Sequence, residues 1–230
     1  MNGKAIIKFL VVIAAIIGLF AYFIQPLAGS LKQGLDLQGG THIVLEAEDS
    51  ATGTADNDAV ERAKQILERR INEMGLSEPL VQREGARRII IELPGVKDPD
   101  EAIKRIGKTA VLEFKNDQGQ TVMTGDDLKD AKEELGQNKQ PLVAIELSDE
   151  GAKKFADLTS KNIGRRIAIT LDGKELTNPV VQQAITGGKA TISGSQSLEE
   201  AKDLAILLRS GALPVKINVL EVRTVGPSLG

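Results

Sequence analysis

The chain contains no cysteine and no tryptophan, and aromatic residues make up only 3% of its 230 residues. Without cysteine, disulfide bonds and thiolate metal sites are excluded, so a folded domain must be held together by its core. Because aromatic side chains are so few, we expect this core to consist mainly of Ile, Leu, Val and Ala. No part of the sequence predicts a cofactor.

Histidine is almost as scarce, since His42 is the only one. A metal site would need carboxylates alone, and a His-based nucleophilic triad could use only this residue. Apolar and polar residues alternate around His42, which places it on the polar face of a strand together with Asp36, Glu46 and Glu48. This pattern predicts a solvated face rather than acid–base catalysis. We therefore expect neither a metal site nor an enzyme, and a membrane-anchored hydrolase is disfavoured.

An excess of positive charge is also absent. The chain has 29 Lys and Arg against 32 Asp and Glu, a net charge of −3. A nucleic-acid-binding protein needs a basic face that displaces counterions, so nucleic acid is not an expected partner. The basic pairs Arg69-Arg70 and Arg87-Arg88 predict a solvated helix face and a strand edge, respectively. Gly187-Gly188-Lys189 lacks the spacing of a phosphate-binding loop.

One long apolar run stands near the amino terminus, from Phe9 to Ile24. Counted from Ala5 it has about 20 residues, which as a helix span about 30 Å, the thickness of a membrane's hydrocarbon core. Backbone groups inside lipid must be hydrogen-bonded within the segment, so the run predicts a transmembrane helix that ends before Pro26. We assign residues 1–30 to a cytoplasmic amino terminus and this helix.

The orientation follows from Lys4 and Lys8, which precede the run, because positive charge beside a membrane span is retained in the cytoplasm. The domain from about Leu31 onward is therefore expected outside the cytoplasm. A cleaved signal peptide is the alternative, although its apolar region normally has only about 7–15 residues. Under both interpretations, the domain lies outside the cytoplasm.

In the first half of that domain, the sequence pattern predicts strands and helices in the order β-α-β-β-α-β. An alternating strand begins at Leu35 and is interrupted by Gly39-Gly40, which indicates a bulge or a close approach of another backbone. A helical stripe follows at Val60, Ala63, Leu67, Ile71 and Met74. Further patterns predict strands at 80–83, 88–93 and 109–115 and a helix from Asp98 to Gly107. This order is the ferredoxin-like plan.

The second half predicts a helix at 126–135, a strand at 142–147, a helix capped by Ser148, a hairpin across Asp172-Gly173, a helix capped by Ser197 and a strand at 215–222. We expect an α+β fold with a base at 31–115, an inserted head at 116–196, and a return to the base at 197–230. Two tandem small α/β units are the alternative.

Several motifs resemble those of a known family. The run GLDLQGGTHIVLE contains Gly34, Leu35, Asp36, Leu37, Gly39 and Gly40. The end of the chain, RTVGPSLG, contains Arg223, Gly226, Pro227 and Gly230, and Asn178-Pro179 lies between. These motifs, in this order, resemble the SecD family of protein-export membrane proteins, which is related to the resistance–nodulation–division transporters.

The resemblance implies an auxiliary subunit of the Sec translocase in the bacterial inner membrane, with SecF, the SecYEG channel, YajC and unfolded preprotein as partners. It implies a ferredoxin-like base and an inserted head that binds preprotein and pulls it outward, coupled to the proton gradient in the full-length protein. The family's later helices, which carry its proton-relay carboxylate, lie beyond Gly230, so the chain looks like an amino-terminal portion.

Rotation of the head on the base is expected at Asn116–Gly119 and Gly194–Ser195, where glycine can absorb dihedral changes. The strand edges near 166–177 and 190–193 could accept an extended peptide. A rival hypothesis is a single-pass membrane-anchored binding or scaffold module with no transport role.

Overall fold

The computed structural model describes residues 10–13, 16–20, 35, 39–49, 53–76, 79–96 and 98–226. The chain divides into two compact units, Met1–Gly34 and Leu35–Gly230. In the first unit, the described residues 10–13 and 16–20 are helical and exposed. No helix within the described residues is both long enough and apolar enough to cross a membrane.

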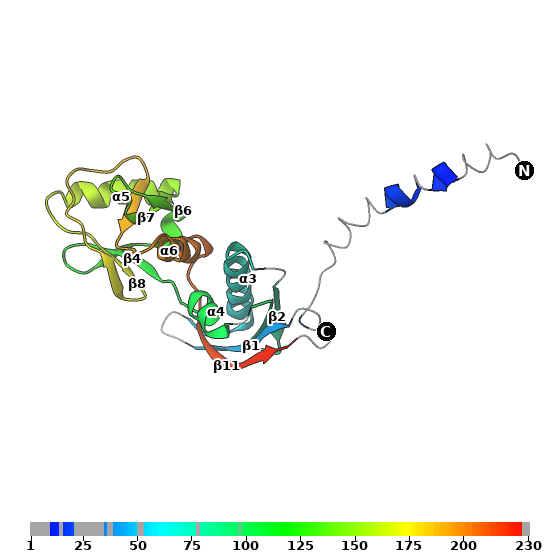
Figure 1. Ribbon diagram of the computed structural model, residues 1–230. Helices are drawn as coiled ribbons and strands as arrows, with labels where there is room; N and C mark the ends of the chain where they lie inside the picture. The colour runs from blue at the N-terminus through cyan, green and yellow to red at the C-terminus, as the bar shows by residue number, and fades with distance from the viewer. Residues whose placement is uncertain are drawn as a thin grey trace, which may run out of the picture. The chain divides into compact units, whose positions relative to one another are not determined.

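One part of the second unit is built on a four-stranded antiparallel sheet. Its strands are β1 (Gly40–Glu48), β2 (Leu80–Glu84), β3 (Arg88–Pro94) and β11 (Lys216–Val225), in the spatial order β11-β1-β3-β2. Together with helices α3 (Asn57–Glu73) and α4 (Pro99–Ile106), these strands form what we call the four-stranded body (Figure 1).

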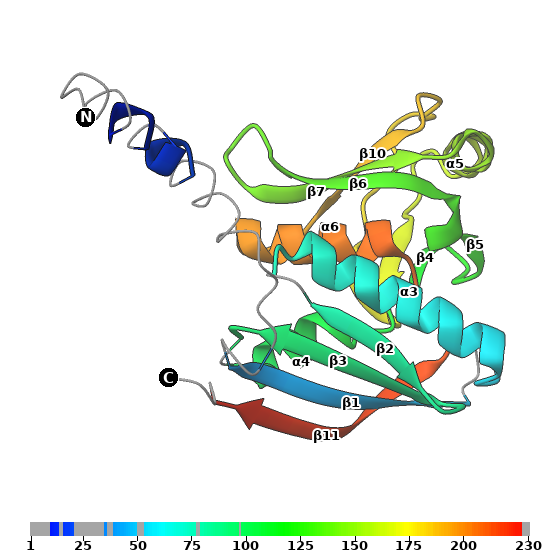
Figure 2. The ribbon, with the colours of Figure 1, turned by 90° about the vertical axis from the view of Figure 1, so that its right-hand side faces the viewer.

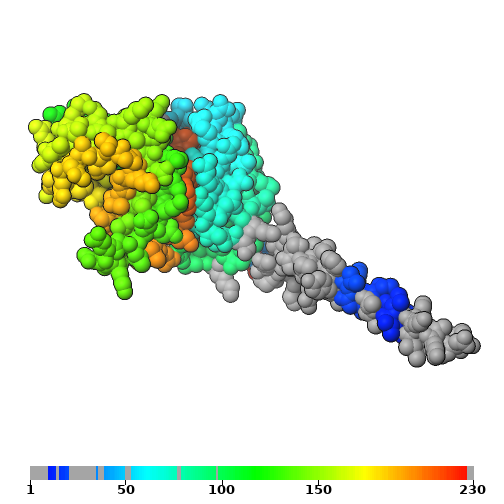
Figure 3. All heavy atoms as spheres, turned by 90° about the horizontal axis from the view of Figure 1, so that it is seen from above, coloured from blue at the N-terminus to red at the C-terminus, as the bar shows by residue number. Residues whose placement is uncertain are grey.

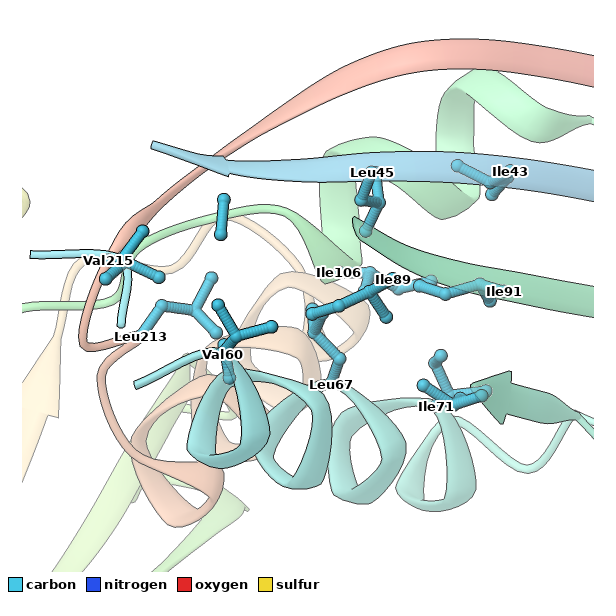
Figure 4. Close-up of a cluster of buried hydrophobic side chains, with 14 of the residues drawn as sticks. Ile43, Leu45, Val60, Leu67, Ile71, Ile89, Ile91, Ile106, Leu213 and Val215 are labelled. Atoms are coloured by element: carbon cyan, nitrogen blue, oxygen red, sulfur yellow. The ribbon is translucent and has the colours of Figure 1, made fainter. Parts of the chain in front are cut away.

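Local sequence determines where these helices begin. The carboxylates of Asp56 and Asp98 accept hydrogen bonds from the N–H groups of Ala59 and Glu101, and Pro99 stands in the first turn of α4. The apolar stripe of α3 faces the sheet, as predicted (Figure 4). Full burial of each large stripe residue contributes about 1.5–3 kcal/mol.

The order β-α-β-β-α-β is present, but its last strand is not the predicted 109–115. Ala110 has a φ of 61°, which breaks the extended backbone, and only β4 (Leu112–Lys115) is a strand. It pairs with other strands, whereas β1 pairs along its length with β11. The fourth strand of the first sheet therefore comes about 100 residues later than predicted, and the intervening chain forms a second body.

This two-sheet body contains a sheet of order β5-β4-β8-β9 and a sheet of order β10-β7-β6. Its elements are β4, β5 (Thr121–Thr124), β6 (Leu128–Leu135), β7 (Pro141–Leu147), α5 (Asp149–Lys161), β8 (Ala168–Leu171), β9 (Lys174–Thr177), β10 (Lys189–Ser193) and α6 (Leu198–Ser210), with one 3-10 turn at Gly125–Asp127. We include α6 because its buried residues Ala201, Leu204, Ala205 and Leu208 belong to the core of these sheets.

The helix predicted at 126–135 is wrong, because β6 occupies most of this range. Its Lys, Glu and Ala residues favour a helix, but β6 pairs antiparallel with β7, whose alternate residues Val143, Ile145 and Leu147 are buried. Tertiary pairing with this apolar strand overrides local preference.

Other predicted boundaries are confirmed. Ser148 and Ser197 cap α5 and α6 through hydrogen bonds from Gly151 and Glu200. Asp172 and Gly173 join β8 and β9 with φ values of 50° and 77°, as a tight hairpin with two left-handed residues requires.

The two bodies meet through their helices. Helix α6 runs beside α3 (Figure 2), and in Figure 3 the orange atoms of α6 lie between the green two-sheet body and the cyan α3. The chain crosses between the bodies at 107–111 and returns at 211–215, where Leu213 and Val215 rejoin the first core. These crossings lie side by side, since the Leu213 N–H donates to the Thr109 carbonyl at 2.8 Å.

Candidate binding cleft

A cleft of about 770 Å³ opens in the two-sheet body. It lies between the sheet β10-β7-β6 and the segment 179–185, which follows β9. Its floor consists of buried apolar side chains from five different segments, namely Ala131, Ile145, Phe155, Ile167, Ile169 and Val181. This size falls in the range of ligand-binding pockets, about 300–1,000 Å³.

Backbone hydrogen bonds hold the segment 179–185 as one wall. The Ile167 N–H donates to the Pro179 carbonyl at 3.1 Å, and the Val181 N–H donates to the Arg165 carbonyl at 2.9 Å. Proline can only accept in such a ladder, so Pro179 fits its position. The wall thus exposes Val180, while Val181 points into the core.

Helix α5 supplies one part of the floor, the side chain of Phe155. Phe155 lies 5.9 Å from Phe114 of β4 in an edge-to-face arrangement, which fixes its ring. Thr159 donates to the Phe155 carbonyl at 2.7 Å and accepts from the Ile185 N–H at 3.0 Å. The Thr159 hydroxyl therefore ties the wall to α5 and has no free role as a nucleophile.

The rim of the cleft carries charges of both signs. The Lys129 ammonium, 2.6 Å from Glu146, holds the pKa of that carboxyl below its ordinary value. Lys132 lies 3.1 Å from Asp130 and lowers the pKa of that carboxyl in the same way. Both acids are therefore ionised at neutral pH, and neither has the raised pKa of a general acid.

The lining of the cleft is suited to binding. Within the described residues, no three His, Cys, Asp or Glu side chains gather in a way that could hold a metal ion. An apolar floor with an ionised rim can bury aliphatic groups while leaving polar groups in water. The cleft can therefore hold apolar segments of an extended ligand.

Among the signature residues, Gly40 begins β1 and Arg223 lies near the end of β11. Gly34, Asp36, Leu37, Pro227 and Gly230 lie outside the described residues. Leu35 and Gly39 lead into the sheet, and the Leu35 carbonyl accepts from the Gly39 N–H at 2.8 Å.

The position of Gly40 leaves no room for a side chain. A Cβ atom there would lie 2.4 Å from the Leu93 carbonyl oxygen and 2.9 Å from the Pro94 Cα, and its φ is 150°. The predicted close approach of another backbone is thus confirmed, and the approaching backbone belongs to β3.

The strand register brings the two signature segments together. Gly40 lies opposite Val225, and His42 lies opposite Arg223. Gly226 follows directly, so β1 begins and β11 ends at the same end of the sheet. His42 is partly exposed, with Nδ1 3.6 Å from Glu92 Oε1.

The candidate hinge residues lie inside the two-sheet body. Asn116 and Gly119 form the turn between β4 and β5, where the Asn116 side chain accepts from the N–H groups of Gln118 and Gln120. Gly194 and Ser195 join β10 to α6, and a Cβ on Gly194 would lie 2.9 Å from the Leu176 carbonyl. The structure does not bring these residues to the crossings, and their role as hinges stays a prediction.

Sequence reasoning missed Arg70. Its side chain is fully buried, so the predicted solvated face is wrong for this residue, although the neighbouring Arg69 is exposed. Arg70 stands three residues after Leu67, on the apolar stripe of α3, and this spacing could have revealed its burial. The cleft was also missed, because its lining comes from segments far apart in the sequence.

Three family models match the chain. They are described as the SecD/SecF GG motif at residues 31–51, the amino-terminal part of the P1 domain of protein translocase subunit SecDF at 60–119, and the SecDF P1 head subdomain at 103–215. The cleft lies within the last of these matches.

Relatives and solved structures agree with these matches. The protein translocase subunit SecD of Acidaminococcus fermentans is 57% identical over 230 residues, which is all of this chain and 55% of that protein. A crystal structure of SecDF in a super-membrane-facing form superposes with a TM-score of 0.76 at 42% identity and covers 87% of this chain and 32% of that one.

A second structure, titled as a membrane component SecDF that enhances protein export, superposes with a TM-score of 0.72 at 40% identity. It covers 79% of this chain, and this chain covers 99% of it. The chain spans about half the length of the SecD proteins of Acidaminococcus fermentans and Dictyoglomus turgidum that it matches. The chain therefore belongs to the SecD family of protein translocase subunits and corresponds to the amino-terminal portion of its longer members.

Proposed function

We propose that this chain serves the Sec protein-export machinery as an auxiliary subunit that holds unfolded preprotein in the cleft of the two-sheet body. The observation that carries the proposal is the open apolar cleft of about 770 Å³ in the region that matches the P1 head subdomain. An unfolded chain in transit exposes aliphatic side chains that this floor can bury.

The cleft also suits a ligand of variable sequence. Its rim carries both lysines and carboxylates, so it favours neither acidic nor basic segments. Strand β10, which contributes Lys189, Ala190 and Thr191 to the lining, is an edge strand of its sheet. An extended peptide can pair with such an edge through its main chain alone, which provides affinity without sequence specificity.

The membrane anchor is part of the proposal. The described helical residues 10–13 and 16–20 expose large apolar side chains, with exposed fractions between 37% for Ile13 and 67% for Phe20. Such a surface is stable in lipid rather than in water. We place the anchor in the bacterial inner membrane with the amino terminus in the cytoplasm and the second unit on the extracytoplasmic side.

We further propose that the four-stranded body is a ferredoxin-like base and that the two-sheet body is the inserted head. The strand pairing supports crossings at 107–111 and 211–215, which are closer to the ends of the head-subdomain match than the limits 116 and 196 expected from sequence. In the longer family members, SecF, SecYEG and YajC are the proposed partners, and the proton gradient is the proposed source of the pulling force.

Crosslinking tests the cleft directly, because no native cysteine interferes. Single cysteines are placed at Val180, on the cleft wall, and at Val122, on β5 outside the cleft. The two valines are matched, with exposed fractions of 45% and 43%. Each variant is introduced into the full-length protein in cells that export a stalled preprotein carrying its own single cysteines.

We expect a disulfide-linked adduct with the preprotein from Val180→Cys and at most a trace from Val122→Cys. Equal crosslinking at both positions, or none at Val180, would overturn the assignment of the cleft. If export also proceeds normally when the cleft is blocked by a bulky thiol reagent at position 180, a scaffold role replaces the proposed one.

A further inference from the structure

The guanidinium group of Arg70 lies at the point where the chain passes between the two bodies. Nη1 donates to the carbonyl oxygens of Ile106, at 2.7 Å, and Lys108. Nη2 donates to the carbonyl oxygen of Gly211 at 2.8 Å and lies 3.5 Å from that of Thr109. Nε donates to Ser210 Oγ at 3.0 Å. All five N–H donors of this side chain therefore have acceptors.

These acceptors lie in the two crossings and in the helix ends that lead into them, and none belongs to a sheet. Ile106 is the last residue of α4 in the four-stranded body, and Ser210 is the last residue of α6 in the two-sheet body. The last carbonyls of a helix have no partner within it and carry its negative end. One buried cation thus caps two helices, one from each body.

The charge of Arg70 is balanced by these dipoles rather than by a close carboxylate. Within the described residues, Arg70 forms no ion pair. Burial lowers the pKa of Arg70 to about 10, and the negative charge of Asp172 partly offsets this decrease. The guanidinium therefore remains protonated at neutral pH. Without its carbonyls it would be a buried charge with no partner, a strongly unfavourable state.

Asp172, in the two-sheet body, also binds the crossing 107–111. Its two carboxylate oxygens accept from the N–H groups of Ala110, at 3.1 Å, and Val111, at 2.9 Å. Its own N–H donates to the Val111 carbonyl at 2.9 Å. The outgoing crossing is therefore fixed by Asp172 to the two-sheet body and by Arg70 to α3.

We propose that Arg70 is a positioning residue that sets the orientation of the two-sheet body on the four-stranded body, by binding both crossings at once. A turn of one body against the other that moves the ends of α4 and α6 apart breaks these bonds, because one guanidinium cannot follow both helix ends. The orientation is thus limited by this contact rather than by the glycines at 119 and 194. The inference goes beyond the proposed binding of preprotein, and only its consequence for export depends on that proposal.

Electron–electron distance measurements between two spin labels test this inference. Cysteines replace Ala86, on the β2–β3 turn, and Asn138, on the β6–β7 turn, because both are exposed and each belongs to a different body. The whole 230-residue chain is used, in detergent micelles because of its apolar run. Arg70→Met is compared with the unmutated chain and with Arg69→Met, the exposed neighbour on the same helix.

We expect one narrow distance distribution for the unmutated chain and for Arg69→Met, and a distribution at least twofold broader for Arg70→Met. Arg70→Lys should be intermediate, because one ammonium cannot reach all of the acceptors. Hydrogen exchange separates this effect from unfolding: the Leu213 amide, bound to Thr109, should exchange at least tenfold faster in Arg70→Met, while amides of β1 stay protected.

An Arg70→Met protein that folds and keeps the narrow distribution would overturn the inference. If this variant does not fold, Ser210→Ala decides, because it removes the acceptor of Nε while the side chain of Arg70 stays in place, and the other bond that it removes, from the Ser210 hydroxyl to the Leu207 carbonyl, lies within α6. Unchanged Leu213 exchange and an unchanged distribution in Ser210→Ala would then refute it. Neither readout involves preprotein, so a failure of the cleft proposal leaves these outcomes unaffected.

Discussion

Arg209 of α6 binds Glu73 of α3 with two nitrogens of its guanidinium. Nη2 lies 2.8 Å and Nε 3.0 Å from the same carboxylate oxygen, Oε2. The remaining nitrogen, Nη1, donates to the Ala131 carbonyl of β6 at 2.6 Å. This side chain therefore joins the two bodies and also holds β6, whose Ala131 forms part of the cleft floor.

Replacing Arg209 should weaken the contact between the bodies. Arg209→Met is expected to lower the free energy of unfolding by about 1–2 kcal/mol, since a partly buried ion pair and a hydrogen bond are lost. Urea unfolding of Arg209→Met, Glu73→Gln and the double variant measures the coupling, expected at about 0.5–1 kcal/mol. Arg165→Met is the control, because its pair with Asp117 is more exposed and should contribute less than about 0.5 kcal/mol. Strict additivity of the two changes would contradict this assignment.

Gly40→Ala should destabilise the four-stranded body by about 2–4 kcal/mol, because the new Cβ overlaps backbone atoms of β3 that cannot move aside as a side chain can. The control is Gly85→Ala in the β2–β3 turn. Gly85 also has a positive φ, of 64°, but an added Cβ meets nothing within 4 Å, so about 1 kcal/mol is expected. Thermal unfolding compares the two, and equal losses would show that only the backbone conformation matters at Gly40.

We predict that the stability of the two-sheet body depends on pH through Glu113. Hydrogen bonds from Lys115, at 2.9 Å, and Thr121, at 2.8 Å, hold the pKa of Glu113 below its ordinary value of 4.5. A carboxyl whose pKa is lowered by folding stabilises the protein above its unfolded pKa, and this stabilisation is lost as the pH falls through the folded pKa.

Glu113→Gln should therefore be less stable than the unmutated chain at pH 7, and the difference should shrink as the pH is lowered from about 4.5 toward 3. Denaturant unfolding at each pH measures it, with Glu68→Gln on the exposed side of α3 as the control. A constant difference over this range would show that the Glu113 contacts do not depend on its charge.

Val180→Ser should weaken the binding of an unfolded, apolar peptide to the cleft by about threefold to tenfold, since a valine side chain contributes about 1 kcal/mol or slightly more when a ligand covers it. Val122→Ser has a similar exposure and lies outside the cleft, so it should leave the affinity unchanged. Fluorescence anisotropy of a labelled peptide measures both. A loss of affinity from Val122→Ser alone would move the binding site to β5.

Local signals predicted most of the helices and tight turns. Asp98, Ser148 and Ser197 each cap a helix where the sequence places a cap, because a capping hydrogen bond involves residues only three positions apart. The Asp172-Gly173 hairpin was predictable for the same reason, since its left-handed backbone angles favour these residue types.

Features that depend on distant contacts were not predictable in this way. Strand β6 contains helix-favouring residues and becomes a strand only because β7 pairs with it. The partner of β1 on one side is β11, and no local pattern tells that strand apart from 109–115. Arg70 is charged and stands in a basic pair, so its burial depends on carbonyls that are distant in the sequence.

The central claim is that the cleft of the two-sheet body holds unfolded polypeptide, and methyl NMR of the isoleucine side chains tests it most directly. An unfolded preprotein segment is titrated into the isotopically labelled chain. We predict saturable shifts of Ile145, Ile167, Ile169 and Ile185, which line the cleft, and none at Ile71, Ile89 and Ile91, which are buried in the core of the four-stranded body. Shifts confined to the four-stranded body, or no shifts at saturating peptide, would contradict the account.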